Sequence, residues 1–250
     1  MTPENTTTAM APMISVLIPA YNEELLIGKV IQAVYASFAA LDYKAWEIIV
    51  CDNNSTDRTS AVAIENGAQV VKEPHNQIAR ARNTAAKSAR GKWLIFIDAD
   101  TYMTSGILGK TIAAFEGGKI CSGGCHLKFD KQNIGWFPTI MTGLWNSISG
   151  FVNLAAGSYL FCYREAWADI GGFDEEVYAG EEIFFSQKLK AWGKERGLKF
   201  KILTGEPVIT SARKMDWYGQ RQLFYHVLKM MWPGSIKKRE SCELWYTRPE

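Results

Sequence analysis

The chain has 250 residues, of which 47% are hydrophobic and 22% are charged, a composition that allows a sizeable buried core. Its 28 basic and 26 acidic residues leave a formal charge of only +2. Nucleic-acid-binding proteins usually carry a clear basic excess, so we expect no nucleic-acid partner.

The ends of the chain and its cysteines bear on the cellular compartment. Residues 1–12 are polar and rich in threonine, without the basic start and apolar run of a signal peptide, so we predict a flexible tail. No stretch reaches the roughly 18 to 20 apolar residues that a membrane-spanning helix needs. The five scattered cysteines suggest no disulfide framework, and no second pair completes a zinc site with Cys121 and Cys125. We therefore expect a cytoplasmic location, which includes the inner face of a membrane.

The first half of the chain alternates short apolar runs with helical patterns. The predicted strands cover 13–19, 47–52, 68–72 and 93–98. The predicted helices cover 23–38, 56–66 and 76–90. This alternation predicts a mostly parallel sheet with helices on both faces, where ligands gather at the carboxyl ends of the strands.

From about residue 104 the pattern is less regular. The predicted elements are a helix at 104–115, strands at 120–128 and 158–163, a helix at 181–192, and short strands at 199–203 and 207–210. Because no linker or repeat interrupts the chain, we predict one domain over 13–250. Its parts are a first half at 13–103, a second half at 104–215 and a C-terminal helical segment at 216–250.

Polar residues end three predicted strands and should meet at one edge of the sheet. They are residues 19–24, 52–57 and 98–100. Helix capping explains Thr56 or Asp57 as well as a function would, but it does not explain Asp98 and Asp100. These two carboxylates would repel each other at the mouth of a low-dielectric sheet unless a cation shared the site. Since Mg²⁺ takes one or two carboxylates and completes its shell with water and phosphate, the pair predicts a metal and a phosphate-bearing ligand.

Together, the sequence blocks resemble the family 2 inverting glycosyltransferases of the nucleotide-diphospho-sugar transferase superfamily, which have the GT-A fold. The blocks are PAYNEE, CDNNSTD, ARN at 81–83, FIDAD at 96–100, the run at 157–175, and GEEIFFSQKLKAWG at 180–193. The resemblance implies an α/β, Rossmann-like GT-A fold. It makes 13–103 the nucleotide-sugar-binding half and 104–215 a smaller, mixed acceptor-side and catalytic half.

The resemblance also assigns a donor site. The residues implied to contact the base and ribose are Pro19, Ala20, Tyr21 and Glu23. Asp52 would accept a hydrogen bond from the imide of a uracil-like or thymine-like base. The residues implied to lie by the ribose and the metal are Asp98, Ala99 and Asp100. Asp100, assisted by Asp98, would bind Mg²⁺ or Mn²⁺, and the donor would be a UDP-sugar or dTDP-sugar, with a GDP-sugar still open.

An inverting transfer also needs a base that takes the proton of the acceptor hydroxyl. Glu181 and Glu182 stand where the family usually carries Glu-Asp, and the second acid is usually the base, so Glu182 is the predicted base. Glu181 remains an alternative, because glutamate is one methylene longer than aspartate. A purely structural pair at a helix start, stabilised by the helix dipole, is the other interpretation.

Three arginines are candidates for contact with the diphosphate, because guanidinium pairs well with phosphate oxygens. They are Arg80, Arg82 and Arg213. Arg213 leads, since it follows a strand where related enzymes often place a mobile loop on the diphosphate. Two departures from the family pattern are the missing glycine before ARN and Asn53 in place of a second aspartate.

Two segments could face the acceptor, a glycan or a lipid-linked sugar. Residues 134–154 are aromatic and apolar, which suits an acceptor subsite, a core helix or an oligomer contact. Residues 217–239 mix aromatic residues with lysine and arginine, as in helices that lie in a membrane interface. A helix packed on the domain's own sheet fits the same pattern, and we slightly favour it.

Three other functions compete with glycosyl transfer. A nucleotidyltransferase would need an early glycine-rich loop, and residues 19–29 contain only Gly28. A Rossmann dehydrogenase would need G-x-G-x-x-G after the first strand, and no such motif follows residues 13–19. A catalytically silent protein that binds a sugar nucleotide or a partner stays open, because Glu-Glu replaces the usual Glu-Asp.

Overall fold

The computed structural model describes residues 11–131, 135–152, 154–230, 232 and 234–246, so most of the predicted tail lies outside the described residues. Within this range, one sheet has the strand order β3-β2-β1-β4-β7-β6-β8-β5. The strands are β1 Ile14–Ala20, β2 Trp46–Asp52, β3 Gln69–Lys72, β4 Trp93–Ile97, β5 Thr101–Tyr102, β6 Ile120–Phe129, β7 Tyr159–Tyr163 and β8 Lys199–Thr210.

Helices connect most of these strands. They are α1 Ile27–Ala40, α2 Thr59–Glu65, α3 Ile78–Ser88, α4 Ser105–Glu116, α5 Trp136–Val152, α6 Arg164–Asp169, α7 Glu181–Glu195, α8 Arg213–Trp217, α9 Gln220–Met230 and α10 Glu243–Tyr246. Two short 3-10 turns, η1 Ser235–Lys237 and η2 Arg239–Ser241, lie between α9 and α10. No helix in the described part of the chain has the length and hydrophobicity that a membrane span requires.

The strands β1 to β4 run parallel, as the alternating pattern predicted. Ala20 at the end of β1 pairs with Asp52 at the end of β2, so two polar strand ends leave the sheet side by side. In the second half, β7 is antiparallel to both β4 and β6, while β6 is parallel to β8. The sheet is therefore parallel where the predicted donor site lies and mixed beyond it.

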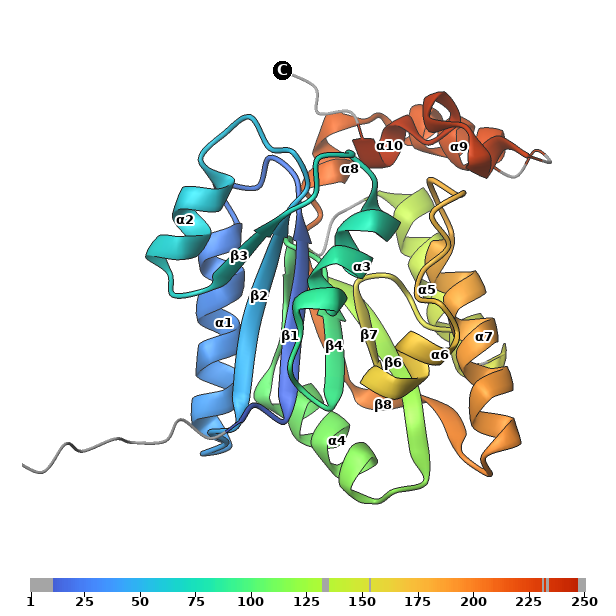
Figure 1. Ribbon diagram of the computed structural model, residues 1–250. Coiled ribbons are helices and arrows are strands. Elements are labelled where there is room, and N and C mark those ends of the chain that lie inside the picture. The colour runs from blue at the N-terminus through green and yellow to red at the C-terminus, as the bar shows by residue number, and fades with distance from the viewer. Residues whose placement is uncertain (1–10, 132–134, 153, 231, 233, 247–250) are drawn as a thin grey trace, which may run out of the picture.

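Helices cover both faces of the sheet (Figure 1). α1 and α4 pack with one face of β1, which carries Val16 and Ile18. α3 and α7 pack on the opposite face, where Leu17 and Phe96 lie. Side chains alternate between the two sides of a strand, so an uninterrupted apolar run supplies side chains to the cores on both faces of the sheet. This accounts for the almost wholly apolar sequences of β1 and β4.

Two helices begin later than predicted because the preceding residues form turns. α1 begins at Ile27, since the backbone N–H of Glu23 donates to Thr59 Oγ1 (2.8 Å) and holds the chain out of the helix. α2 begins at Thr59, whose N–H donates to Asp57 Oδ1 (2.9 Å). Asp57 thus has a structural role in the turn before α2, although the N-cap position itself is Arg58 and makes no side-chain cap hydrogen bond.

Elements in the second half also differ from the prediction. The strands predicted at 199–203 and 207–210 are one strand, β8, because its pairing with β6 continues past a register shift between Cys125 and Leu127. The main packing partners of α9 are α5, α10 and the two 3-10 turns, and Leu223 packs with Leu244. The favoured packing of this helix on the sheet was therefore wrong.

Gly123 marks the tightest approach between strands in this half. A Cβ added there would lie 1.9 Å from the backbone oxygen of Lys201 in β8. We expect Gly123→Ala to destabilise the protein by about 3 kcal/mol or more, because the strands must separate. Gly143→Ala is the control, since a Cβ at that helical position meets nothing within 4 Å. Urea unfolding should show a free energy of unfolding for the control within about 1 kcal/mol of the parent. Equal losses in both variants would contradict the crowding at Gly123.

Candidate functional site

A cavity of about 110 Å³ lies at the carboxyl ends of β1 and β4. Its lining includes most residues that the sequence assigned to the donor site, namely Pro19, Ala20, Tyr21, Glu23, Asp98, Ala99 and Asp100. Asn53, Ile78 and Trp245 also line it, although the sequence did not assign them to the site. The structure thus gathers the first and fourth strand ends around one space.

Asp52 is held by its own loop at the end of β2. Its Oδ1 accepts a hydrogen bond from the Ser55 N–H (2.9 Å) and its Oδ2 accepts one from the Ser60 hydroxyl. Burial alone would raise the pKa of this carboxyl, but the hydrogen bonds from Ser60 and Ser55 outweigh it and lower the pKa. Asp52 therefore stays ionised behind the cavity, and its neighbour Asn53 reaches the lining.

Asn53 donates two hydrogen bonds that the aspartate usual at this position could not donate. Its Nδ2 donates to the carbonyl oxygens of His75 (2.5 Å) and Glu73 (3.3 Å). Because a carboxylate has no proton to donate, an aspartate would face two carbonyl oxygens with negative charge. The departure from the family pattern is therefore matched to the loop that follows β3.

Arg82 of α3 is a buried cation shared by three parts of the chain. Its Nη1 donates to Glu181 Oε1 at the start of α7 (2.6 Å). Its Nη2 donates to Asp98 Oδ1 (2.9 Å) and to the carbonyl oxygen of Gly157 (3.0 Å). Burial alone would lower the pKa of the guanidinium, but the charges of Asp98, Glu181 and Glu182 outweigh it and raise the pKa. We call Arg82, Asp98 and Glu181 the Arg82 bridge.

Asn83, the next residue of the ARN block, fixes the loop that leads to α7. Its Nδ2 donates to the Phe173 carbonyl and to Glu175 Oε1, both at 2.9 Å. Its Oδ1 accepts from the Phe173 N–H, also at 2.9 Å. Arg82 and Asn83 therefore position the loop and the helix start that carry the two glutamates.

The two glutamates at the start of α7 have different environments. Glu181 is 4% exposed and is paired with Arg82. Glu182 is partly buried, and burial together with the neighbouring Glu181 charge raises its pKa to about 8, against the opposing effect of Arg82. One carboxylate is thus committed to an ion pair, and the other is poised to exchange a proton near neutral pH.

Arg213 and Arg80 are placed differently. Nη2 of Arg213 donates to both carboxylate oxygens of Glu23 (2.8 and 2.7 Å), which lines the cavity. Its Nε is buried with no hydrogen-bond partner among the described residues. Arg80 instead pairs with Glu175 (3.0 Å) and does not line the cavity. Of the three candidate arginines, Arg213 and Arg82 contact cavity residues.

The C-terminal segment reaches the cavity through Trp245 of α10, a placement that no motif predicted. The Tyr246 hydroxyl donates to the Tyr178 carbonyl (3.0 Å) and accepts from the Ile78 N–H (3.3 Å). The Tyr178 N–H donates to the Ile236 carbonyl (2.6 Å). The segment is therefore tied both to α3 and to the loop before the two glutamates.

Asp98 and Asp100 are the cavity carboxylates that a hard divalent cation would use, and Asp98 also pairs with Arg82. Both line the cavity, and Asp100 is 7% exposed. The described residues contain no cluster of three or more His, Cys, Asp or Glu side chains suited to a metal. Mg²⁺ accepts so sparse a set, because water and phosphate oxygens complete its shell.

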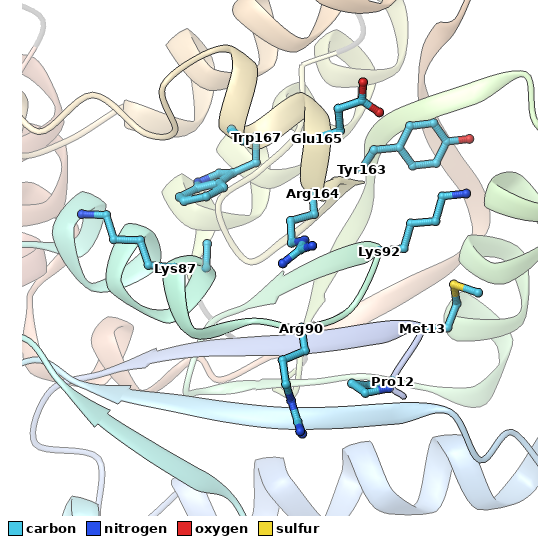
Figure 2. A pocket seen from close by; sticks show the side chains of 11 residues that line it. Pro12, Met13, Lys87, Arg90, Lys92, Tyr163, Arg164, Glu165 and Trp167 are labelled. Atoms are coloured by element: carbon cyan, nitrogen blue, oxygen red, sulfur yellow. The ribbon is translucent and has the colours of Figure 1, made fainter. Parts of the chain in front are cut away.

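A second, larger cavity of about 670 Å³ lies at the other end of the sheet, where β1 and β4 begin. Figure 2 shows its lining side chains, which include Lys87, Lys92, Arg164 and Trp167. None of the residues that the sequence assigned to the site lines it. The smaller cavity, which gathers the strand ends, is therefore the candidate site.

Comparison with known proteins connects this geometry to one family. Residues 15–164 match the family model described as Glycosyl transferase family 2. WfgD of Escherichia coli, a UDP-Glc:alpha-D-GlcNAc-diphosphoundecaprenol beta-1,3-glucosyltransferase, is 35% identical over 92 residues, which cover 35% of each chain. The GalNAc(5)-diNAcBac-PP-undecaprenol beta-1,3-glucosyltransferase of Campylobacter jejuni is 30% identical over 190 residues, which cover 72% of this chain and 60% of that protein. The chain thus spans less than two thirds of either relative.

A solved structure shows the same fold. The mannosyltransferase PcManGT from Pyrobaculum calidifontis, in complex with GDP-Man and Mn²⁺, superimposes with a TM-score of 0.64. The match covers 88% of this chain and 60% of that one, at 20% sequence identity. The α/β GT-A fold expected from the sequence is confirmed.

The Arg82 bridge can be tested by its contribution to the free energy of unfolding. Arg82→Met leaves Glu181 buried without its cation, so we expect a loss of about 3 to 5 kcal/mol in the free energy of unfolding. Arg80→Met, two residues along the same helix, removes a half-exposed ion pair and should cost within about 1 kcal/mol. Urea unfolding measures both, and similar small losses would show that the bridge does not hold the site.

The raised pKa of Glu182 predicts a pH-dependent stability. A carboxyl whose pKa rises from an ordinary 4.5 to about 8 on folding favours the folded state at low pH, and this contribution is lost as the pH rises from about 4.5 to about 8. Glu182→Gln should therefore match the parent near pH 4.5, become more stable than it as the pH rises to about 8, and keep a constant lead above that. Melting temperatures across this pH range measure the effect, with the exposed Glu195→Gln as control. If both variants had the melting temperature of the parent at every pH, the raised pKa of Glu182 would be refuted.

Proposed function

Because the chain belongs to glycosyl transferase family 2, we propose that it transfers a sugar from a nucleoside-diphosphate donor to an acceptor hydroxyl, with inversion at the anomeric carbon. One observation carries the proposal. The cavity joins the end of β1, where a nucleoside would bind, to Asp98 and Asp100, where a diphosphate and its metal would bind. The bridge then links Asp98 to the start of α7, where the catalytic acids are expected.

The donor is proposed to lie along the strand ends. Pro19, Ala20 and Tyr21 would flank the base and ribose, and Trp245 would close the cavity over them. Asp52 would accept a hydrogen bond from the imide N–H of a pyrimidine base. The relative named for UDP-Glc and the fold neighbour bound to GDP-Man support a nucleoside-diphosphate hexose as donor, with the base left to experiment.

Arg213 is proposed to contact the diphosphate. It adjoins the cavity through Glu23, and its buried Nε could donate to a phosphate oxygen. A divalent metal held by Asp100 and Asp98 would stabilise the negative charge that develops on the departing diphosphate. The fold neighbour that binds Mn²⁺ supports such a metal, with Mg²⁺ the alternative.

Glu182 is proposed to act as the base. It would take the proton from the acceptor hydroxyl while that oxygen attacks the anomeric carbon from the side opposite the diphosphate. The bond from the anomeric carbon to the diphosphate oxygen breaks, and its electron pair leaves with the nucleoside diphosphate. Glu181 is less suited to this role because Arg82 holds its carboxylate in an ion pair.

The acceptor is proposed to be a sugar linked to a polyprenyl diphosphate, at the cytoplasmic face of a membrane. Both curated relatives described above are named for undecaprenol-linked acceptors. The exposed apolar residues of α5 and α9 give this chain a surface that suits such a lipid.

Donor binding can be tested by thermal shift with a panel of nucleoside diphosphates and their sugars, each with Mn²⁺, with Mg²⁺ and with a chelator. A ligand that binds the native state raises its melting temperature, so one donor should stabilise the protein in a metal-dependent way. Trp245→Ala should lose about tenfold or more in affinity for that donor, because the ring that covers the cavity is removed. A folded protein that no nucleotide stabilises would overturn the proposed function.

Turnover tests the assignment of the base. Glu182→Gln should abolish transfer while leaving donor affinity nearly unchanged, and Glu181→Gln should cost stability as well. In the parent, kcat/KM should rise with pH through an apparent pKa near 8, because only the ionised Glu182 of the free enzyme accepts a proton. Near-normal turnover in Glu182→Gln would move the role elsewhere, and donor binding without turnover in the parent would identify a silent binding protein.

A further inference from the structure

The helices α5 and α9 expose an apolar surface beside the candidate site. On α5, Trp136, Ile140 and Leu144 are 65%, 58% and 49% exposed, and their spacing of four residues places them on one face. On α9, Phe224 and Leu228 are 53% and 54% exposed and also lie four residues apart. Trp232, just after α9, is 76% exposed. These six residues are the α5/α9 surface.

The two helices that carry this surface lie against each other (Figure 1). A Cβ added to Gly135, just before α5, would come within 2.3 Å of Gln220, the first residue of α9. An ion pair between Lys131 and Asp216 joins the segments that precede them. The starts of the two helices are therefore held together.

The segment that carries α9 is basic, and two of its basic side chains are exposed. Residues 217–239 contain five Lys or Arg residues and no Asp or Glu, and residues 132–163 contain no charged residue. Lys229 and Lys237 pair with Glu243 and Glu176, while Arg221 and Lys238 are exposed. Apolar and aromatic side chains flanked by lysine and arginine are what an anionic lipid surface attracts.

The surface is also connected to the donor cavity. Leu223, on the buried side of α9, packs with Leu244 of α10. The next residue of α10, Trp245, lines the cavity. The helix that carries half of the α5/α9 surface is thus packed on the helix that lines the donor cavity.

From these observations the geometry points to the α5/α9 surface as a docking site for an anionic membrane. The helices lie in the lipid interface, with the apolar side chains among the acyl chains and Arg221 and Lys238 at the headgroups. This deepens the proposed function and rests on it for the lipid-linked acceptor. A protein partner would not need the exposed basic residues Arg221 and Lys238 of the same segment, so a lipid occupant accounts for more of the observations.

The test is flotation of the whole protein with unilamellar vesicles of phosphatidylcholine, alone or with phosphatidylglycerol, without donor or metal. The protein should float with the anionic vesicles, less with the neutral ones, and less again as salt is added. The double variant Ile140→Ser, Leu228→Ser should lower the partition coefficient about tenfold or more, because two side chains that enter the lipid become polar. Neither residue belongs to the donor site.

A matched control is available elsewhere on the surface. Leu25 and Ile64 are 74% and 61% exposed, and the double variant Leu25→Ser, Ile64→Ser makes the same chemical change outside the α5/α9 surface. It should float like the parent. Equal loss in the two double variants, or no flotation of the parent with anionic vesicles, would overturn the inference.

Two parallel measurements separate the remaining outcomes. Nucleotide-induced thermal shifts should be the same in the parent and in Ile140→Ser, Leu228→Ser. A parent that floats with anionic vesicles but shows no shift with any nucleotide would overturn the proposed function and leave the membrane surface standing. Sedimentation velocity without lipid reports self-association. A dimer that this variant dissociates, in a protein that does not float, would identify a second copy as the occupant and contradict the membrane.

Discussion

The buried guanidinium of Arg82 is the contact on which the arrangement of this site depends. It joins Asp98, at the end of β4, to Glu181, at the start of α7, and it also holds the carbonyl of Gly157 before β7. These groups come from the parallel half of the sheet, the mixed half and a helix 99 residues further along the chain. A charge at this depth is stable only when opposite charges surround it, so the three parts must assemble together.

The same contact separates the roles of two adjacent glutamates. Arg82 neutralises Glu181 and keeps it in place, while Glu182 feels the Glu181 charge and a partly buried environment that together raise its pKa. A carboxyl that titrates near neutral pH, as the proposed base requires, thus lies beside a fixed anion. This is how neighbouring titratable groups come to have separate chemical roles.

The parallel half of the fold and the strand ends could be predicted from the sequence because they depend on local patterns. Apolar runs in β1 and β4 are buried on both faces, and the carboxyl ends of parallel strands must share an edge. Arg82 was predicted only as a phosphate contact, because its partners Asp98 and Glu181 are distant in sequence and no periodicity reports their approach. The role of Asn53 likewise depends on two carbonyl oxygens that follow β3.

The C-terminal segment could be predicted least, for a physical reason. The pattern of α9 fits packing on a sheet and exposure to lipid equally well, because amphipathicity specifies a face and not its partner. Trp245 was missed altogether, since a lone tryptophan on a four-residue helix carries no motif. Its position becomes evident only once Tyr246 anchors that helix to α3 and to the loop before α7.

The most direct test of the central claim is the anomeric configuration of the first product, read by proton NMR during transfer from an α-linked nucleotide sugar. A single displacement in which Glu182 activates the acceptor must give a β-linked product. A product that keeps the α configuration would require a different mechanism and would contradict the assignment of Glu182 as the base.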